Sequence, residues 1–173
     1  MKAARVLMPP NVWRAMELPD VHAVVHMEQQ ACQHPSHAWT ADNYRSSLRS
    51  GYWSRVCVNT HGRISGVCVA MMGVDEVHLL NIAVARESQG QGLALWMLAQ
   101  LDELCRIHDR PVIWLEVRPS NQPALALYQS QQYAQVAVRK GYYPAVHGRE
   151  DALVMKRDVW RVQAQGGQHA AMD

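Results

Sequence analysis

Apolar and polar positions along the first half of the chain predict a strand, two helices and then three strands. Asn59 to Gly62 have the composition of a hairpin turn, and the next turn lies at 73–76. We therefore expect the three later strands to pair as an antiparallel meander. The expected elements are a strand at 12–17, a helix from Val21 to the break at His34, a helix from Thr40 or Asp42 to Gly51, and strands at 52–59, 64–72 and 77–84.

In the second half, helices and strands alternate. Apolar residues repeat every three to four positions from Leu93 to Leu104 and predict the longest helix. Ser120 is placed to cap a later helix, which carries Pro123 in its first turn. The expected elements are a helix at 89–108, a strand at 112–117, a helix at 121–130, a strand at 133–139, a loop at 140–150 and a last strand at 152–156.

Composition favours one folded domain. The 173 residues are 49% hydrophobic and 18% charged, which is enough for one buried core and too few for two ordinary domains. The formal net charge is +2 and no basic block is present, so we expect no direct binding to nucleic acid. No apolar run is long enough for a membrane span. Residues 1–10 contain no apolar stretch of secretory length, so we expect a cytoplasmic protein.

The cysteines and histidines do not predict a metal site. His22 and His26 are four residues apart, but no Cys-x-x-Cys or His-Glu-x-x-His spacing occurs, so we expect no bound metal. Cys105 lies on the amphipathic long helix, where core packing is expected rather than a role as an acyl-carrying nucleophile. The following four cysteines are widely spaced among apolar neighbours and are expected to be reduced: Cys32, Cys57, Cys68 and Cys105.

A glycine-containing loop precedes the long helix. Gly90 and Gly92 let the backbone approach a ligand, and the free N–H groups of a helix start can bind phosphate oxygens. The same loop can also be a simple flexible connection. It lacks the Gly-Lys-Ser or Gly-Lys-Thr of a P-loop. Leu95 stands where a dinucleotide fingerprint has its third glycine, and the loop follows a meander instead of opening a parallel βαβ unit.

Two further residues stand out from their surroundings. Glu116 is a lone carboxylate in an apolar strand, so it is either solvated from a cleft or paired, with Arg118 on the same strand face as one partner. Tyr128 follows Asn121 by two helical turns, so both side chains lie along one helix face. Tyr128 can be a proton donor or an amphipathic core residue.

Several segments, in order, resemble the RimI family of the GNAT superfamily of acetyl-CoA-dependent N-acetyltransferases. The similarity covers most of residues 12 to 157, with the Gln-x-x-Gly-x-Ala loop at the head of the long helix at its centre. The chain departs from the family at two places: Ser36 to Ala38 are inserted after Pro35, in a loop that borders the peptide site, and Gln132 replaces the usual glycine after the second helix of this half. The matching segments are 80–84, 89–94, 115–118, 120–121, 124–128, 142–144 and 148–152.

The resemblance implies an α/β (α+β) fold: a single GNAT-type domain with a mixed central sheet of about six or seven strands and helices on both faces. We expect this domain over residues 1–158 and a flexible C-terminal tail over 159–173. RimI enzymes acetylate the N-terminal alanine of ribosomal protein eighteen of the small subunit. The implied enzyme transfers acetyl directly from acetyl-CoA, its cosubstrate, to that peptide in a ternary complex.

The resemblance also implies a role for each site residue. Glu116 matches the general base and Tyr128 the general acid, and Asn121 matches an asparagine that contacts the coenzyme. Tyr142 and Tyr143 are expected to pack against the first substrate residues. The backbone that follows the pantetheine is expected at Ile82, Ala83 and Val84, and the pyrophosphate loop at Gly90, Gln91, Gly92, Leu93, Ala94 and Leu95.

The chemistry of the amine favours an amino terminus mildly. A peptide α-amine has an ordinary pKa of about 7.7–8.0, against about 10.4 for lysine. A carboxylate base therefore removes the proton of an α-amine more easily than that of a lysine. Two alternatives remain open: a GNAT enzyme acting on another protein N-terminus, a lysine or a small amine, and a non-enzymatic module that binds acyl-CoA.

Overall fold

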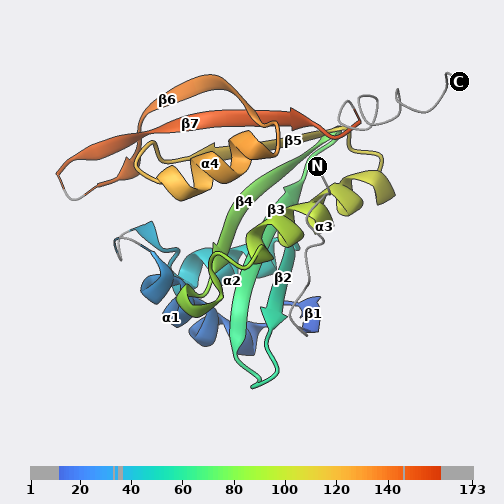
Figure 1. The fold of residues 1–173 in the computed structure, drawn as a ribbon, viewed down its shortest axis with the longest axis vertical. Coiled ribbons are helices and arrows are strands. Elements are labelled where there is room, and N and C mark those ends of the chain that lie inside the picture. The colour runs from blue at the N-terminus through green and yellow to red at the C-terminus, as the bar shows by residue number, and fades with distance from the viewer. Residues whose placement is uncertain (1–11, 33, 35–36, 146, 161–173) are drawn as a thin grey trace, which may run out of the picture.

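The computed structural model describes residues 12–160 except 33, 35–36 and 146, and arranges them around one mixed sheet (Figure 1). The sheet has seven strands in the order β1-β2-β3-β4-β5-β7-β6, which confirms the predicted fold class. The strands are β1 (Val12–Ala15), β2 (Trp53–Val58), β3 (Ile64–Met72), β4 (Glu76–Val84), β5 (Val112–Val117), β6 (Ala134–Pro144) and β7 (Arg149–Asp158). The helices are η1 (Leu18–Asp20), α1 (Val21–Ala31), α2 (Ala41–Arg49), η3 (Arg86–Ser88), α3 (Leu93–Ile107) and α4 (Gln122–Ser130).

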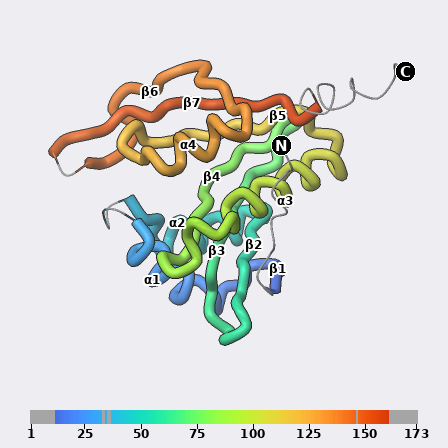
Figure 2. The backbone as a smooth tube through the Cα atoms, viewed as in Figure 1, coloured from blue at the N-terminus to red at the C-terminus, as the bar shows by residue number. Residues whose placement is uncertain are grey.

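The only parallel pairing among the described strands joins β4 to β5, and it is short. It runs from Glu76 opposite Val112 to Leu79 opposite Leu115. Beyond Leu79, β4 continues to pair with β3 as far as Val84, while β5 continues to pair with β7. The sheet therefore opens between β4 and β5. The tube view shows the two arms: β1 to β4 with α1 and α2, and β5 to β7 with α4 (Figure 2).

Each face of the sheet is covered by its own helices. Residues of α3 and α4 pack with β4, β5 and β7 in one buried cluster that includes Met97, Leu101 and Ile113. Residues of α1 and α2 pack on the other face in a second cluster that includes Val24 and Val67. Fully burying such a side chain contributes about 1.5–3 kcal/mol. The two clusters stabilise both arms of the sheet, although β4 and β5 separate between the arms.

Two predicted helix starts are wrong. The long helix begins at Leu93, because Gly92 adopts a left-handed conformation with φ of 82° and ends the preceding turn. Asn121, and not Ser120, caps α4: its Oδ1 accepts a hydrogen bond from the Ala124 N–H at 3.3 Å.

The predicted loop at 140–150 is largely strand. β6 continues to Pro144 and β7 begins at Arg149, with Pro144 opposite Arg149. Because β6 is an edge strand with exposed residues along nearly all of its length, it has no alternating buried face from which its end could be predicted.

Gln132 keeps the backbone geometry for which the family uses glycine. Its φ is 64°, in the left-handed region. The Gln132 N–H donates to the Gln129 carbonyl and the Tyr133 N–H to the Tyr128 carbonyl, both at 3.0 Å, which closes the end of α4. The turn after α4 is therefore formed without a glycine.

The cysteines are free thiols, as predicted. Burial raises the pKa of both Cys68 and Cys105 to about 12, so Cys105 packs as a core residue. Within 12–160, the described helices include none with the length and hydropathy to cross a membrane. Most of the predicted tail at 159–173 and part of the insertion at 36–38 lie outside the described residues.

Candidate active site

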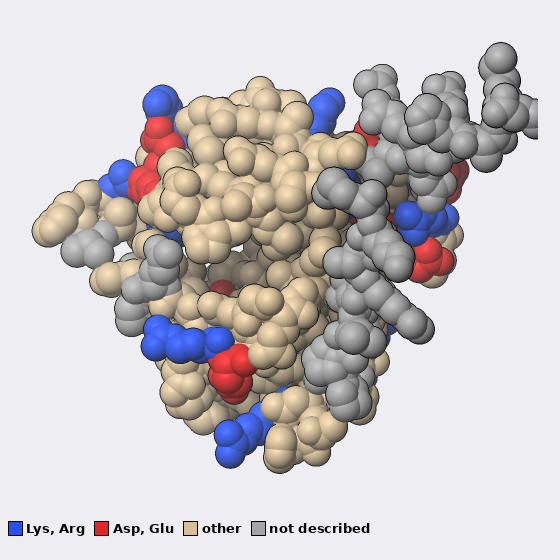
Figure 3. Space-filling model, viewed as in Figure 1, with Lys and Arg blue, Asp and Glu red and all other residues tan. Residues whose placement is uncertain are grey.

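The gap between β4 and β5 is a cavity of about 730 Å³. Its walls come from α1, β4, the start of α3, the end of β5, α4 and Tyr143 on β6. The space-filling view shows an opening on this face among mainly uncharged side chains (Figure 3). A volume of this size is in the range of small-molecule and cofactor sites.

One wall of the cavity is a free strand edge. Ile82, Ala83 and Val84 line the cavity and pair with β3 on their other side. Since β5 has turned away at this level, the backbone N–H and C=O groups of this segment that face away from β3 have no strand partner among the described residues. An extended ligand with amide groups can pair there as an added strand would.

The glycine turn supplies the second wall. Among the described residues, no backbone or side-chain acceptor pairs with the N–H groups from Gly90 to Leu95; the first to find a carbonyl is the N–H of Trp96, bonded to Gly92 at 2.9 Å. Gly90 has a φ of 73°, and a Cβ there would meet open space, so the backbone is freely approached. Clustered free N–H groups at a helix start fit a pyrophosphate. Gly90, Gly92, Leu93, Ala94 and Leu95 line the cavity, whereas Gln91 does not.

The side chains of Gln89 and Gln91 both support this turn; Gln89 also lines the cavity, whereas Gln91 does not. The Gln89 side chain donates to the Val84 carbonyl at 3.1 Å and so ties the loop to the end of β4. The Gln91 side chain donates to the Glu87 carbonyl at 2.8 Å. Gln91 was predicted to hold the pyrophosphate; its side chain is turned to Glu87, and its backbone N–H lies with the other free amides of the turn.

Glu116 lines the cavity from β5, and its partner differs from the one that strand alternation suggests. Glu116 Oε1 forms an ion pair with Arg139 of β6 at 3.2 Å. Arg118 does share the cavity face, but it pairs with Glu150 at 3.2 Å and donates to the Pro144 carbonyl at 2.9 Å. The pairing of Glu116 with Arg118, which the sequence left open as one alternative, is therefore not the one observed, because the β6–β7 hairpin supplies a partner for each.

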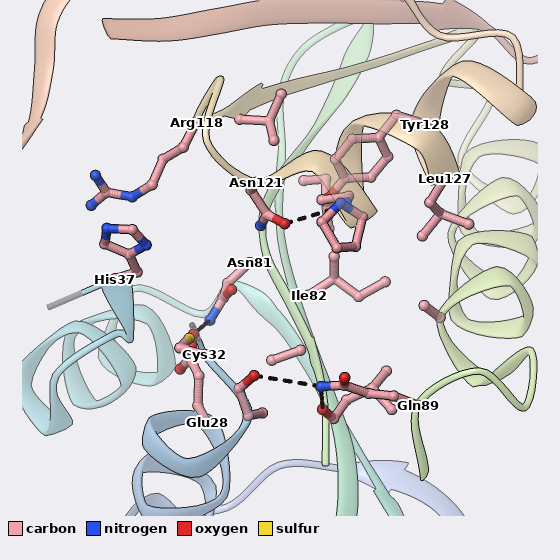
Figure 4. Close-up of a pocket in the computed structure, with 18 of the residues that line it drawn as sticks. Glu28, Cys32, His37, Asn81, Ile82, Gln89, Arg118, Asn121, Leu127 and Tyr128 are labelled. Carbon is pink, nitrogen blue, oxygen red and sulfur yellow. Dashed lines mark hydrogen bonds between the residues drawn. The ribbon is translucent and has the colours of Figure 1, made fainter. Parts of the chain in front are cut away.

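Tyr128 on α4 and Asn121 at the N-cap of that helix both line the cavity, above Ile82 in Figure 4. The Tyr128 side chain is 6% exposed, and burial raises the pKa of its phenol well above the ordinary value, so the hydroxyl stays protonated. In the described structure, no residue hydrogen-bonds to this hydroxyl. Asn121 uses its Oδ1 for the helix cap, which leaves its amide hydrogens available to a ligand.

The two tyrosines of β6 are not equivalent. Tyr143 lines the cavity beneath Arg118, whose guanidinium lies 4.2 Å from the ring centroid. Tyr142 is 42% exposed, does not line the cavity, and packs edge-on against Tyr143 at 4.9 Å between centroids. Only Tyr143 is thus placed to touch a ligand in the cavity; Tyr142 supports it.

Sequence reasoning missed a buried polar cluster at the other end of the cavity. Glu28 of α1 is 3% exposed and accepts hydrogen bonds from the Tyr44 hydroxyl at 2.5 Å and from Asn81 Nδ2 at 3.1 Å. Burial raises the pKa of Glu28, and these hydrogen bonds oppose the rise. Glu28 and Asn81 line the cavity, with Cys32, His37 and Trp39 nearby. A charge within the apolar repeat of the first helix was the available signal.

Replacing Glu150 is expected to loosen the hairpin that carries Tyr143. Burial opposes ionisation of Glu150, but hydrogen bonds from Ser120 and Arg118 outweigh it and hold its pKa below 4.5. Glu150→Gln should therefore lower the free energy of unfolding by about 1 kcal/mol at pH 7. The advantage of the parent protein should be present above about pH 4.5 and shrink as the pH falls through the lower, folded pKa. Urea unfolding of both proteins at pH 7 and in acid measures it; an equal difference at both pH values would contradict the ionic origin.

Comparison with known proteins identifies the class that this fold and cavity define. The model of the acetyltransferase (GNAT) family matches residues 18–133. The chain belongs to this family of N-acetyltransferases, whose members use acetyl-CoA. The free strand edge and the amides of the glycine turn agree with that class of ligand.

Closer relatives place the chain within one branch of the family. It is 33% identical over 145 residues to the [ribosomal protein bS18]-alanine N-acetyltransferase of Escherichia coli K12, covering 84% of this chain and 95% of the relative. A putative enzyme of the same name from Bacillus subtilis is 33% identical over 82% of this chain and 91% of its own. The crystal structure of the E. coli ribosomal-protein-S18-alanine N-acetyltransferase superposes with a TM-score of 0.75 at 32% identity, covering 86% of this chain and 94% of that one. The chain is a member of the RimI family, as the sequence predicted.

Proposed function

We propose that the protein transfers the acetyl group of acetyl-CoA to the α-amine of the N-terminal alanine of ribosomal protein bS18. The observation that carries the proposal is the cavity at the β4–β5 split, which Glu116, Tyr128 and the free amides of the glycine turn all line. The activity named for relatives at 33% identity supports the choice of substrate. A ribosomal substrate places the enzyme in the cytoplasm, and the net charge of +2 favours a peptide over RNA as its partner.

Residues of this chain fit acetyl-CoA along two walls of the cavity. The N–H groups of Gly90 to Leu95 bind the pyrophosphate, and the edge at Ile82, Ala83 and Val84 pairs with the pantetheine amides. Asn121 donates from its free amide hydrogens to the same ligand. When bound, the coenzyme supplies an acetyl thioester that is open to attack by an amine.

Glu116 acts as the general base. The α-amine enters the cavity largely as an ammonium and must lose a proton before its nitrogen can attack the acetyl carbon. The Glu116 carboxylate takes this proton directly or through one water. Its ion pair with Arg139 orients it from the solvent side of β6.

Tyr128 acts as the general acid. The nitrogen–carbon bond forms as the carbon–sulfur bond breaks, and the departing thiolate must be protonated. Because burial keeps the Tyr128 phenol protonated and no described residue holds its hydroxyl, the proton can be donated to sulfur. Tyr143 and Arg118 wall the side of the cavity at which the peptide enters, and no covalent enzyme intermediate is required.

A peptide panel tests the substrate. We expect rapid acetylation of a peptide that begins with the alanine terminus of bS18, none of the same peptide with an acetyl-blocked terminus, and at least about a hundredfold slower acetylation of an internal lysine in that blocked peptide. The lower pKa of the α-amine and the depth of the cavity both favour the terminus. Mass spectrometry locates the added acetyl group. Faster acetylation of a lysine or a small amine would show that the proposed substrate is wrong. Binding of acetyl-CoA without turnover of any amine would favour a non-enzymatic module that binds acyl-CoA.

A further inference from the structure

We infer that Asn81 accepts a hydrogen bond from the substrate's α-amine through Oδ1, and that Glu28 and Tyr44 hold the Asn81 amide in the required orientation. The inference rests on the proposed function, which it deepens by naming a residue that recognises the amine. It rests on the hydrogen bonds among Glu28, Tyr44 and Asn81, which leave Asn81 Oδ1 as an acceptor that faces the cavity.

A bulge in β4 brings Asn81 to this position. Val69 lies opposite Asn81 and Ala70 opposite Leu79, so Leu80 is an extra residue in the β3–β4 register. The bulge resets the alternation of side chains, because Leu80 and Ala83 pack in the cluster under α1 and α2 while Leu79 and Ile82 pack on the α3 face. Asn81 is thereby turned toward α1 instead of the α3 face.

The hydrogen bonds of Asn81 fix which end of its amide faces the cavity. Nδ2 donates to Glu28 Oε1 at 3.1 Å and to the Tyr44 hydroxyl oxygen at 2.8 Å, which uses both of its hydrogens. A carboxylate only accepts, so the opposite rotamer would set Oδ1 against Glu28. Figure 4 shows the Asn81 nitrogen turned toward Glu28 and its oxygen turned away from it.

The cluster behind Asn81 is buried and joined by hydrogen bonds. Tyr44 is fully buried and donates to Glu28 Oε2 at 2.5 Å, and the Trp39 backbone N–H also donates to Glu28. In contrast, Asn81 Oδ1 accepts no hydrogen bond from any residue in the described part of the chain, although Asn81 lines the cavity. An acceptor held in place and left without a donor is suited to a ligand N–H.

The β4–β5 register places Asn81 across from Glu116, at the point where the two strands separate. Leu79 is opposite Leu115, so the next residues, Leu80 with Asn81 on β4 and Glu116 on β5, flank the point at which the strands part. A substrate ammonium there has three N–H groups. One proton passes to Glu116, and a second N–H stays bonded to Asn81 Oδ1, which orients the nitrogen lone pair toward the acetyl carbon.

A cycle of two peptides and two proteins tests the contact. The peptides are the alanine-starting peptide and a propionyl analogue, which lacks only the amine; calorimetry with coenzyme A present measures binding without turnover. Asn81→Ala should weaken the binding of the alanyl peptide roughly tenfold or more. The affinity for the propionyl analogue should be unchanged, because only the alanyl peptide has an amine N–H that bonds to Asn81. Equal weakening of both peptides, or of neither, would overturn the inference.

Two further variants separate recognition from folding. Glu28→Gln keeps the shape of the side chain but leaves one oxygen where two accept hydrogen bonds from Asn81 and Tyr44, so it should reproduce the selective loss for the alanyl peptide; full affinity in this variant would refute the positioning role of Glu28. His78 is on the same strand as Asn81 but does not line the cavity, so His78→Ala should leave the affinity for both peptides unchanged. Coenzyme affinity should be unchanged in all three. If the wild-type protein acetylates a different amine, the proposed substrate fails, and the same cycle with that amine and its des-amino analogue tests Asn81.

Discussion

Glu116→Gln is expected to lower kcat/KM for an alanine-starting peptide by about 10²–10⁴. The substitution keeps the shape of the side chain and an oxygen for Arg139, but it removes the group that accepts the amine's proton. Binding of acetyl-CoA should be unchanged, since the proposed coenzyme contacts lie on β4, α3 and α4. Steady-state rates across the peptide concentration range, with calorimetry for the coenzyme, measure both effects.

Glu103→Gln is the matched control for this substitution. Glu103 is an exposed residue of α3 that pairs with Arg106 at 3.0 Å and does not line the cavity, so its loss should leave kcat/KM within about twofold. A correctly folded Glu116→Gln variant with the parent rate would show that the proton is accepted elsewhere. An equal loss in the Glu103 control would point to a general change of charge.

Tyr128→Phe is expected to reduce kcat by about 10²–10³, with little change in KM for either substrate. The ring, which packs in the core cluster, is retained, and only the hydroxyl proposed to protonate the leaving thiolate is lost. Because the phenol is kept protonated by burial, the loss should be similar across neutral pH. Rates at saturating substrates from pH 6 to 9 test this.

Tyr133 provides an unusually close control. Its ring centroid lies 5.6 Å from that of Tyr128, its buried hydroxyl has no hydrogen-bond partner among the described residues, and it does not line the cavity. Tyr133→Phe removes an unsatisfied polar atom and should leave kcat within about twofold, with stability unchanged or slightly raised. If both phenylalanine variants retained the parent rate, another group, or water, would protonate the thiolate.

Predictions from sequence succeeded where a residue's neighbours along the chain decide its environment. The strands at 64–72 and 112–117 have the predicted bounds, because each carries a buried apolar run between clear turns. Thr40 caps α2 through a bond with the Asn43 N–H at 3.3 Å, a contact between residues three positions apart. The glycine turn before α3 was recognised for the same reason, since positive φ and free N–H groups are local properties.

Predictions failed or were missing where distant segments meet. The partner of Glu116 is Arg139, more than twenty residues away, and Arg118 is held by the far side of the same hairpin. The extent of β6 depends on β7, because an edge strand exposed along most of its length has no buried face to mark its end. The cluster of Glu28, Tyr44 and Asn81 joins a helix, a second helix and a bulged strand, and no local pattern contains it.

The sequence by itself therefore determined the class of fold, the family, most element positions and the identity of the carboxylate, phenol and glycine turn proposed for the chemistry. These depend on periodicity and on short motifs, which are carried by nearby residues. Only the tertiary structure decided that β4 and β5 part after Leu79, that Glu116 of β5 and Arg118 just after it pair with the β6–β7 hairpin, and that Asn81 faces α1. Strand register, a bulge and the pairing of distant side chains are set when whole segments pack, because their free energy comes from contacts that do not exist in any one segment.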